Sequence, residues 1–236
     1  MQNEDKAWID YREKFSEVYD AANYSRSLQS SVMRESHRLA EKAIGEQAYF
    51  GRVLEVGAGT GEHLKFVRHT FGEYILSDLD PRTLDIAKHK LAHISNGNVT
   101  FDVQSGSELA YPDNTFDRVV AIHVLEHIYQ PHLALKEWRR VLKHGGLMSI
   151  VIPTDPGIAW RLGRLFGPRD NAIARGMDYD YVMAREHVNS CNNLIAFLRH
   201  YFPGSKEAWW PLRIPSMDVN LFFAFHAIVD KRENGK

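Results

Sequence analysis

The sequence lacks several features that mark particular classes of protein. Its 236 residues include one cysteine, Cys191, so an internal disulfide cannot form, and there is no C-x-x-C pair for zinc or redox chemistry. No apolar run approaches the roughly 20 residues that span a bilayer. The first residues also lack the basic start and apolar core of a signal peptide. These absences predict a cytoplasmic protein without a transmembrane segment.

Charge of one sign is not in excess. The chain has 29 Lys and Arg residues against 30 Asp and Glu residues, which gives a formal net charge of −1. Proteins that capture nucleic acid by charge alone are strongly basic, so we expect no DNA partner, and RNA is disfavoured. The length suits one α/β domain with a sizeable core. A monomer and a homodimer are both compatible with it.

What the chain does have is a run of three alternate glycines after a short β-branched segment. These glycines follow the apolar residues 53–56, and a helix-like segment comes next. Glycine adopts positive φ without strain and lets a ligand approach the backbone closely. Backbone N–H groups at the start of the following helix would face that ligand. The pattern predicts a nucleotide-type pocket whose wall includes Val56, Gly57, Ala58, Gly59 and Gly61.

Acidic residues distinguish this pocket from a dinucleotide site. The G-x-G-x-x-G fingerprint would place a glycine where Glu62 stands. Glu55, near the end of the first strand, would repel a pyrophosphate and attract an ammonium group. Asp78 ends the next apolar run 21 residues after Gly57 (78 − 57), close to the roughly 20 expected of an acid that holds ribose hydroxyls. With Leu79 against a purine face, these residues predict a ligand that has an amino-acid end and an adenosine end.

Further segments carry a resemblance to a known family. Residues 109–117 (LAYPDNTFD) resemble its L-P-F-x-D-x-S-F-D stretch, and residues 123–127 (HVLEH) resemble its v-L-E-H segment. Residues 137–146 (EWRRVLKHGG) resemble its E-x-x-R-v-L-k-P-G-G segment, with His144 in place of proline. Together with the glycines, these ordered segments resemble the small-molecule branch of the class I S-adenosylmethionine-dependent methyltransferases. The resemblance is strong over 52–154 and is specific, whereas a lone glycine motif would be weak.

The resemblance implies a fold, a cofactor and further site residues. The implied fold is an α/β, Rossmann-like, doubly wound sheet of seven strands, mostly parallel with an antiparallel last strand, flanked by helices. S-adenosyl-L-methionine would bind at the carboxyl ends of the strands, beside Ile122 and His123. After methyl transfer it would leave as S-adenosyl-L-homocysteine. Many relatives carry an acid after the third strand for the adenine amino group. This chain has Ser105 there, with Asp102 as an alternative.

Strand-like and helix-like segments alternate along the chain, which is typical of a parallel sheet. We divide the chain into a helical cap over 1–50 and a methyltransferase domain over 51–236, with a substrate-covering insertion at about 153–187. An amphipathic helix is predicted from Trp8 to Val18. The expected helices cover about 31–44, 62–70, 131–142 and 191–201, and another opens at Asp80. The expected strands cover 53–56, 74–77, 99–103, 119–122 and 147–152, and a final pair of strands covers 207–210 and 221–229.

Histidines follow the fourth strand and end the insertion. His123 and His127 have i, i+4 spacing, but no third ligand has suitable spacing, so no metal is expected. A histidine titrates near neutrality and can remove a proton from a hydroxyl or an amine. His127 and His187 are therefore the candidate catalytic residues, and packing is the alternative role for each.

Four arginines of the insertion are interleaved with apolar side chains. They form either the solvated face of a lid helix or a site for a phosphorylated, carboxylated or lipid-linked acceptor. The second alternative includes peripheral membrane contact through 160–175. The residues concerned are Arg161, Arg164, Arg169 and Arg175, with Trp160, Leu165 and Phe166 among them.

The sequence thus predicts a methyltransferase that moves a methyl group from S-adenosyl-L-methionine to an oxygen or nitrogen nucleophile of a small molecule. An anionic, lipid-linked or sugar-linked acceptor would suit the insertion. An RNA or protein methyltransferase and a non-catalytic cofactor-binding partner subunit are the alternatives. The acceptor motif N/D-P-P-Y/F is missing after the fourth strand, where His123-Val124-Leu125-Glu126 stands.

Overall fold

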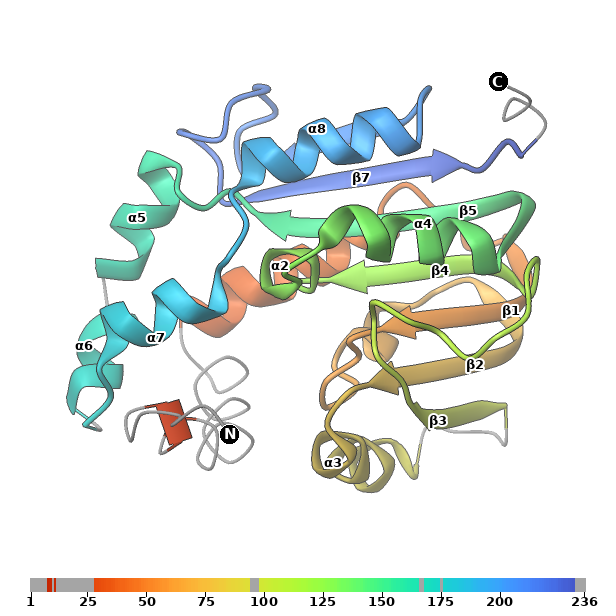
Figure 1. The fold of residues 1–236 in the computed structure, drawn as a ribbon, viewed down its shortest axis with the longest axis horizontal. Helices are drawn as coiled ribbons and strands as arrows, with labels where there is room; N and C mark the ends of the chain where they lie inside the picture. Colours follow the sequence, from red (N-terminus) through yellow and green to blue (C-terminus); the bar gives the residue numbers. More distant parts are fainter. Residues whose placement is uncertain are drawn as a thin grey trace.

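A seven-stranded sheet forms the centre of the computed structural model, which describes residues 8, 9, 11, 28–93, 98–165, 168–174 and 176–231. The strand order is β3-β2-β1-β4-β5-β7-β6 (Figure 1). Neighbouring strands from β3 to β5 are parallel, and β7 runs antiparallel to β5 and β6. This confirms the predicted fold class. The strands are β1 (Tyr49–Val56), β2 (Thr70–Asp78), β3 (Val99–Val103), β4 (Phe116–Ile122), β5 (Leu142–Pro153), β6 (Lys206–Trp210) and β7 (Phe222–Ile228).

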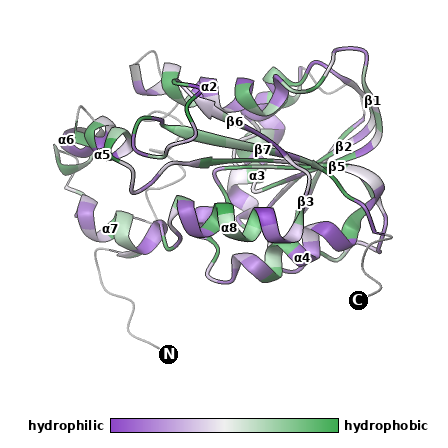
Figure 2. Ribbon diagram, turned by 90° about the horizontal axis from the view of Figure 1, so that it is seen from above, coloured by the Kyte–Doolittle hydropathy of each residue, from purple (hydrophilic) through white to green (hydrophobic). Residues whose placement is uncertain are grey.

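Helices cover both faces of the sheet. Figure 2 shows α4 and α8 on one side of the strands and α2 on the other. Three shorter helices, α5 to α7, occupy the connection between β5 and α8. The described helices are α2 (Leu28–Glu41), α3 (Pro81–Leu91), α4 (Pro131–Val141), α5 (Ile158–Leu165), α6 (Pro168–Ala174), α7 (Tyr179–Glu186) and α8 (Cys191–Tyr201), with 3₁₀ turns η1 (His63–Phe66) and η2 (Leu125–His127).

Two hydrophobic cores follow from this layering. Successive residues of a strand point to opposite faces, and both Val119 and Val120 of β4 are fully buried. Val119 belongs to the core that includes Trp138 of α4, whereas Val120 belongs to the core that includes Leu39 of α2 and Leu84 of α3. Continuous apolar strands are expected where a parallel sheet is covered on both faces.

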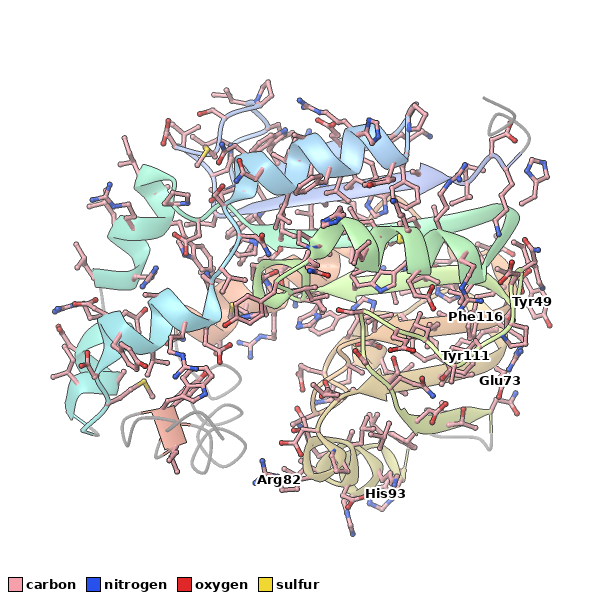
Figure 3. The ribbon with its side chains drawn as sticks, in the orientation of Figure 1. Tyr49, Glu73, Arg82, His93, Tyr111 and Phe116 are labelled. Carbon is pink, nitrogen blue, oxygen red and sulfur yellow. The ribbon has the colours of Figure 1, made fainter. Side chains whose placement is uncertain are left out.

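The carboxyl ends of the parallel strands meet at one edge of the molecule. In Figure 1 the arrows of β1, β2, β4 and β5 point toward the side that carries α5, α6 and α7. Figure 3 labels Tyr49, Glu73 and Phe116 on the opposite side, where these strands begin. Open parallel sheets bind ligands at the carboxyl edge. The turn after β1, the end of β2 and the segment after β4 therefore all lie where a ligand is expected.

The predicted helix over 62–70 is wrong. Only the four-residue η1 forms there, and β2 begins at Thr70 rather than at 74. Thr70 pairs with Tyr49, and Phe71 pairs with Phe50 of β1. A helix reaching residue 70 would remove these β-branched and aromatic residues from the sheet, which they favour. Most of the predicted helix from Trp8 to Val18, including Phe15 and Val18, lies outside the described residues.

Candidate functional site

The turn over 57–61, called here the glycine turn, has the backbone conformation that requires glycine. Gly57, Gly59 and Gly61 have φ values of +66°, +54° and +75°. A Cβ at Gly57 would lie 2.5 Å from Cγ2 of Val124, and one at Gly61 would lie 2.6 Å from Cδ1 of Leu91. A Cβ at Gly59 would have no atom within 4 Å. Two of the glycines are thus required by packing, and the third faces open space.

A pocket lies beside the glycine turn. Its wall contains six of the predicted cofactor-binding residues and three that the sequence did not indicate. Val56, Gly61, Asp78, Leu79 and Ser105, which were also predicted, do not line it. The lining residues are His37, Glu55, Gly57, Ala58, Gly59, Thr60, Glu62, Ile122 and His123.

Asp78, at the end of β2, holds the glycine turn in place. Its Oδ2 accepts a hydrogen bond from the Gly59 N–H at 2.9 Å, and its Oδ1 accepts one from the Asp80 N–H at 3.0 Å. Burial raises the pKa of the Asp78 carboxyl. A carboxylate has about four acceptor positions, so these backbone bonds leave acceptor capacity for a ribose hydroxyl. Leu79 beside it is 71% exposed, as expected of a side chain that a purine would cover.

Glu55 forms the floor of the pocket from β1. Its side chain is buried, and its Oε2 accepts a hydrogen bond from the Tyr74 hydroxyl at 2.8 Å. Burial raises the pKa of Glu55. Because an adjacent positive charge favours the ionised form of a carboxyl, an ammonium group in the pocket would offset this burial.

Helix α2 reaches the pocket because a buried ion pair fixes its end to the sheet. Arg118 of β4 is fully buried and donates through Nη2 to Oε1 of Glu41 at 2.5 Å. His63 Nε2 lies 3.1 Å from the same oxygen. Burial acts to raise the pKa of Glu41, but the His63 hydrogen bond and the Arg118 charge outweigh it and lower the pKa to about 2. One turn earlier in α2, His37 lines the pocket.

Neither residue considered for adenine binding lines the pocket. Asp102 Oδ2 accepts hydrogen bonds from the Tyr111 hydroxyl at 2.7 Å and from Gln104 Nε2 at 3.1 Å. Tyr111, labelled in Figure 3, packs its ring edge-on against Phe116. Ser105 Oγ accepts from the Ser107 N–H at 3.3 Å. Asp102 is thus engaged in packing at the edge strand, and the adenine contact stays a prediction for Ser105.

His123 connects the pocket to a second group of side chains. It follows β4 with a φ of +57°, a strained value for a residue with a Cβ. Its Nε2 lies 2.9 Å from Ser36 Oγ of α2, and its Nδ1 lies 3.4 Å from Glu126 Oε1. We call the group that continues from it the histidine cluster: His123, His127 and His187 with Glu126, Asp155 and Glu186.

His127 lies between two carboxylates of the histidine cluster. Its Nδ1 is 3.0 Å from Glu186 Oε2 and donates to the Glu186 carbonyl at 2.8 Å, and its Nε2 is 3.9 Å from Glu126 Oε1. Burial acts to lower the pKa of His127, but the Glu186 hydrogen bond and the Glu126 and Glu186 charges raise it to about 9. Burial likewise acts to raise the pKa of Glu126, but its hydrogen bond to His123 and the neighbouring histidine charges lower it.

His187, predicted as the second catalytic candidate, lies against His127. The two ring centroids are 5.1 Å apart in an edge-on arrangement. His187 Nδ1 lies 2.8 Å from Asp155 Oδ2, and the two side chains are only 12% and 13% exposed. The backbone N–H groups of Val188 and Asn189 donate to the Glu126 carbonyl, which brings the end of α7 to η2. The structure thus joins two candidates that are 60 residues apart (187 − 127).

The arginines of the insertion mostly meet carboxylates and a tyrosine. Arg164 donates to Asp155 Oδ2 at 3.3 Å and to the Tyr179 hydroxyl at 3.0 Å, and Arg169 pairs with Asp180 at 2.8 Å. Arg161 is exposed, and Arg175 lies outside the described residues. In the described part of the chain, no group of His, Cys, Asp and Glu side chains is arranged to hold a metal ion. Nor is any described helix long and apolar enough to cross a membrane.

Comparisons with known proteins add to what the geometry of the site indicates. A family model described as a methyltransferase domain matches residues 54–150. A ubiquinone/menaquinone biosynthesis C-methyltransferase from Pseudomonas fluorescens is 31% identical over 153 residues, which are 61% of this chain and 59% of that protein. A 2-methyl-6-phytyl-1,4-hydroquinone methyltransferase from Oryza sativa is 36% identical over 107 residues, which are 44% of this chain and 32% of that protein. The chain thus spans less than two thirds of these relatives.

A solved structure shows the same fold. Phosphoethanolamine N-methyltransferase 2 from Haemonchus contortus, in complex with S-adenosyl-L-methionine, has a TM-score of 0.70 and 15% identity over 98% of this chain and 61% of that chain. At this identity the likeness concerns the fold alone. The family match, the relatives and the glycine turn agree with the resemblance in the sequence. Over residues 54–150 the chain therefore resembles the methyltransferase domain of the class I S-adenosylmethionine-dependent methyltransferases.

Proposed function

We propose that this protein is an enzyme that transfers a methyl group from S-adenosyl-L-methionine to a small organic molecule. The observation that carries the proposal is the glycine turn, which Asp78 ties to β2 while Gly59 faces open space. The cofactor supplies a methyl group already activated by the sulfonium charge. The work left to the protein is to position the acceptor and to exclude water.

The residues present fit this cofactor. Asp78 has acceptor capacity left for a ribose hydroxyl, and exposed Leu79 offers an apolar face to the purine. At the other end, buried Glu55 lines the pocket and suits an ammonium group. His123 and Ile122 close the pocket on the β4 side, where the methyl group would face the histidine cluster.

The acceptor is a small molecule that carries an aromatic ring or a lipid tail. The Pseudomonas and Oryza relatives are named for quinone biosynthesis and for a phytyl-hydroquinone, and a phytyl group is a long hydrocarbon. These names support carbon as a nucleophile alongside the predicted oxygen or nitrogen. The near-zero net charge does not favour an RNA acceptor.

The outer face of α5 supports a lipid-linked acceptor. Ile158, Leu162 and Leu165 follow i, i+4, i+7 spacing and are 57%, 49% and 54% exposed. Figure 2 shows α5 and α6 at one end of the molecule, beyond the sheet. On the same helix, Trp160 and Arg164 contact the histidine cluster. An apolar surface thus adjoins the proposed acceptor site, and we propose that it rests on a lipid surface.

Calorimetry with S-adenosyl-L-methionine and S-adenosyl-L-homocysteine tests the proposal. We expect saturable binding of both, and Asp78→Ala should weaken it about 100-fold, because hydrogen bonds to a charged group contribute roughly 1.5–3 kcal/mol each. The absence of saturable heat for the wild-type chain would overturn the proposal. Transfer of labelled methyl to hydroquinones, phosphoethanolamine, RNA and protein then separates the alternatives. Binding without transfer to any of them would indicate the partner subunit.

A further inference from the structure

The two histidines of the cluster that were predicted as bases have different surroundings. His127 has a carboxylate near each ring nitrogen: Glu186 at Nδ1 and Glu126 at Nε2. Among the described residues, His187 has a carboxylate only at Nδ1, where Asp155 lies 2.8 Å away. Within the described chain, Nε2 of His187 has no hydrogen-bonding partner. One histidine is thus enclosed by acids, and the other keeps one nitrogen open.

These surroundings fix different forms of the two rings. Two flanking carboxylates favour a proton on each nitrogen of His127, and its pKa of about 9 agrees with a cation at neutral pH. A protonated ring cannot accept another proton. In contrast, Asp155 accepts a hydrogen bond from Nδ1 of His187, and this places the proton on Nδ1 and the lone pair on Nε2. Arg164 Nη1 lies 3.3 Å from the same oxygen of Asp155, Oδ2, and places a positive charge beside that carboxylate.

We propose that His187 is the general base of methyl transfer, that Asp155 is its positioning residue, and that His127 serves instead as a fixed positive charge for the acceptor anion. This rests on the proposed function, because the acceptor must lie beside the cofactor pocket. The link is contiguous: His123 lines the pocket and packs on Phe222, Phe222 packs on Trp160, and Trp160 stacks on His187.

The chemistry points to an aromatic hydroxyl as the acceptor group. Nε2 of His187 takes the hydroxyl proton, and the freed electron pair forms the bond to the methyl carbon from the oxygen or from a conjugated ring carbon. The carbon–sulfur bond breaks, and its electrons neutralise the sulfonium. When carbon is methylated, that carbon then loses its own proton to water. A phenol, with a pKa of about 10, gives its proton to histidine far more readily than an aliphatic alcohol does.

The surroundings of His187 suit a flat ring with more than one oxygen. Its neighbours are themselves aromatic: Trp160 stacks on His187 with ring centroids 6.3 Å apart, and Phe222 packs edge-on against Trp160 at 6.0 Å. The indole Nε1 of Trp160 is buried without a hydrogen-bonding partner among the described residues. Buried donors are rarely left unpaired. A second acceptor oxygen would satisfy it, as in a hydroquinone.

Nitrogen NMR of the histidine side chains tests the assignment without any turnover. The full chain is labelled with ¹⁵N, saturated with S-adenosyl-L-homocysteine and observed near pH 7.5. His127→Gln and His187→Gln assign the two signals by their loss. We expect a doubly protonated His127 and a His187 protonated on Nδ1 only, and Asp155→Asn should disturb the His187 pattern while leaving His127 protonated. A doubly protonated His187, or one protonated on Nε2, would overturn the proposal.

Single-turnover methyl transfer to 1,4-dihydroxynaphthalene tests the chemical role. We expect His187→Gln to lower the rate about 100- to 1,000-fold, with the dissociation constant of S-adenosyl-L-homocysteine changed less than about three-fold. Added imidazole should restore part of the activity of His187→Gly. His200→Gln, an exposed histidine of α8, is the matched control and should leave the rate unchanged. If the chain binds S-adenosyl-L-homocysteine but methylates neither this hydroquinone nor catechol, the acceptor class is wrong and the proposed function stands.

Discussion

The cofactor pocket and the histidine cluster adjoin each other but are built in different ways. The pocket depends mainly on the backbone conformation of the glycine turn, which Asp78 holds in place. The histidine cluster depends on side-chain charges from η2, the end of β5 and the end of α7. The first construction suits a ligand that is the same throughout a family. The second can be changed one side chain at a time, which suits an acceptor that differs between relatives.

The largest effect expected on the pocket side comes from the buried ion pair beneath it. Glu41→Gln leaves the Arg118 guanidinium fully buried without its counter-charge. Removing one partner of such a pair lowers the free energy of unfolding by about 3–5 kcal/mol. Urea unfolding measures it. The matched control is Glu46→Gln, whose partner Arg68 is exposed, and a loss below about 1 kcal/mol is expected there. Equal losses in the two variants would show that the buried pair contributes no more to the free energy of unfolding than the exposed pair does.

The glycine turn was predictable, and the ion pair that supports it was not. Alternate glycines and an acid at the next strand end are local signals, because each reflects a backbone requirement at its own position. Arg118 lies in an apolar strand and Glu41 ends a distant helix, so nothing in either segment indicates the partner. The wrong helix over 62–70 has a related cause. Thr70 and Phe71 pair with β1 and therefore belong to a strand, and the hydrophobic periodicity of the segment does not indicate this pairing.

The histidine cluster shows the same division between local and distant signals. His127 and His187 were predicted from residue type and position, and the structure brings them together. The residues that distinguish them, Asp155 and Glu186, have no motif. They are defined only once the connection between β5 and α8 folds back onto η2. The sequence therefore indicates which side chains can transfer protons. The tertiary contacts indicate which ring nitrogens of each histidine carry a proton.

A second comparison separates packing from ligand contact within the glycine turn. Gly61→Ala adds a Cβ 2.6 Å from Leu91 Cδ1 at a φ of +75°, so we expect a loss of about 2–4 kcal/mol in unfolding free energy from strain and overpacking. Gly59→Ala shares the positive φ but meets no atom. It should lose only about 1–2 kcal/mol and mainly weaken S-adenosyl-L-homocysteine binding. Urea unfolding and calorimetry on both variants check this. The reverse ranking would mean that Gly59 does not face the ligand.

The charge on His127 gives the histidine cluster a pH signature. Its folded pKa of about 9 lies above the ordinary 6.5, so its contribution to stability is fully present below pH 6.5 and is lost as the pH rises through about 9. Glu186→Gln removes one flanking charge and should shift this loss to lower pH. His226, with a pKa lowered to about 4, does not titrate in this window. Urea unfolding between these pH values measures the effect, and identical curves for variant and wild type would contradict it.

The smallest effect concerns the outer face of α5. Leu162→Ser should weaken flotation with vesicles of phosphatidylglycerol and phosphatidylethanolamine about five-fold, because partial burial of one leucine contributes roughly 1 kcal/mol. Leu133→Ser is the matched control, since Leu133 is similarly exposed, at 42%, on α4. Equal weakening by both variants, or no flotation of the wild type, would remove the lipid surface from the proposal. Because α5 carries Trp160 and Arg164 on the face that meets the histidine cluster, a lipid surface on its other face would place a lipid-linked ring within reach of His187.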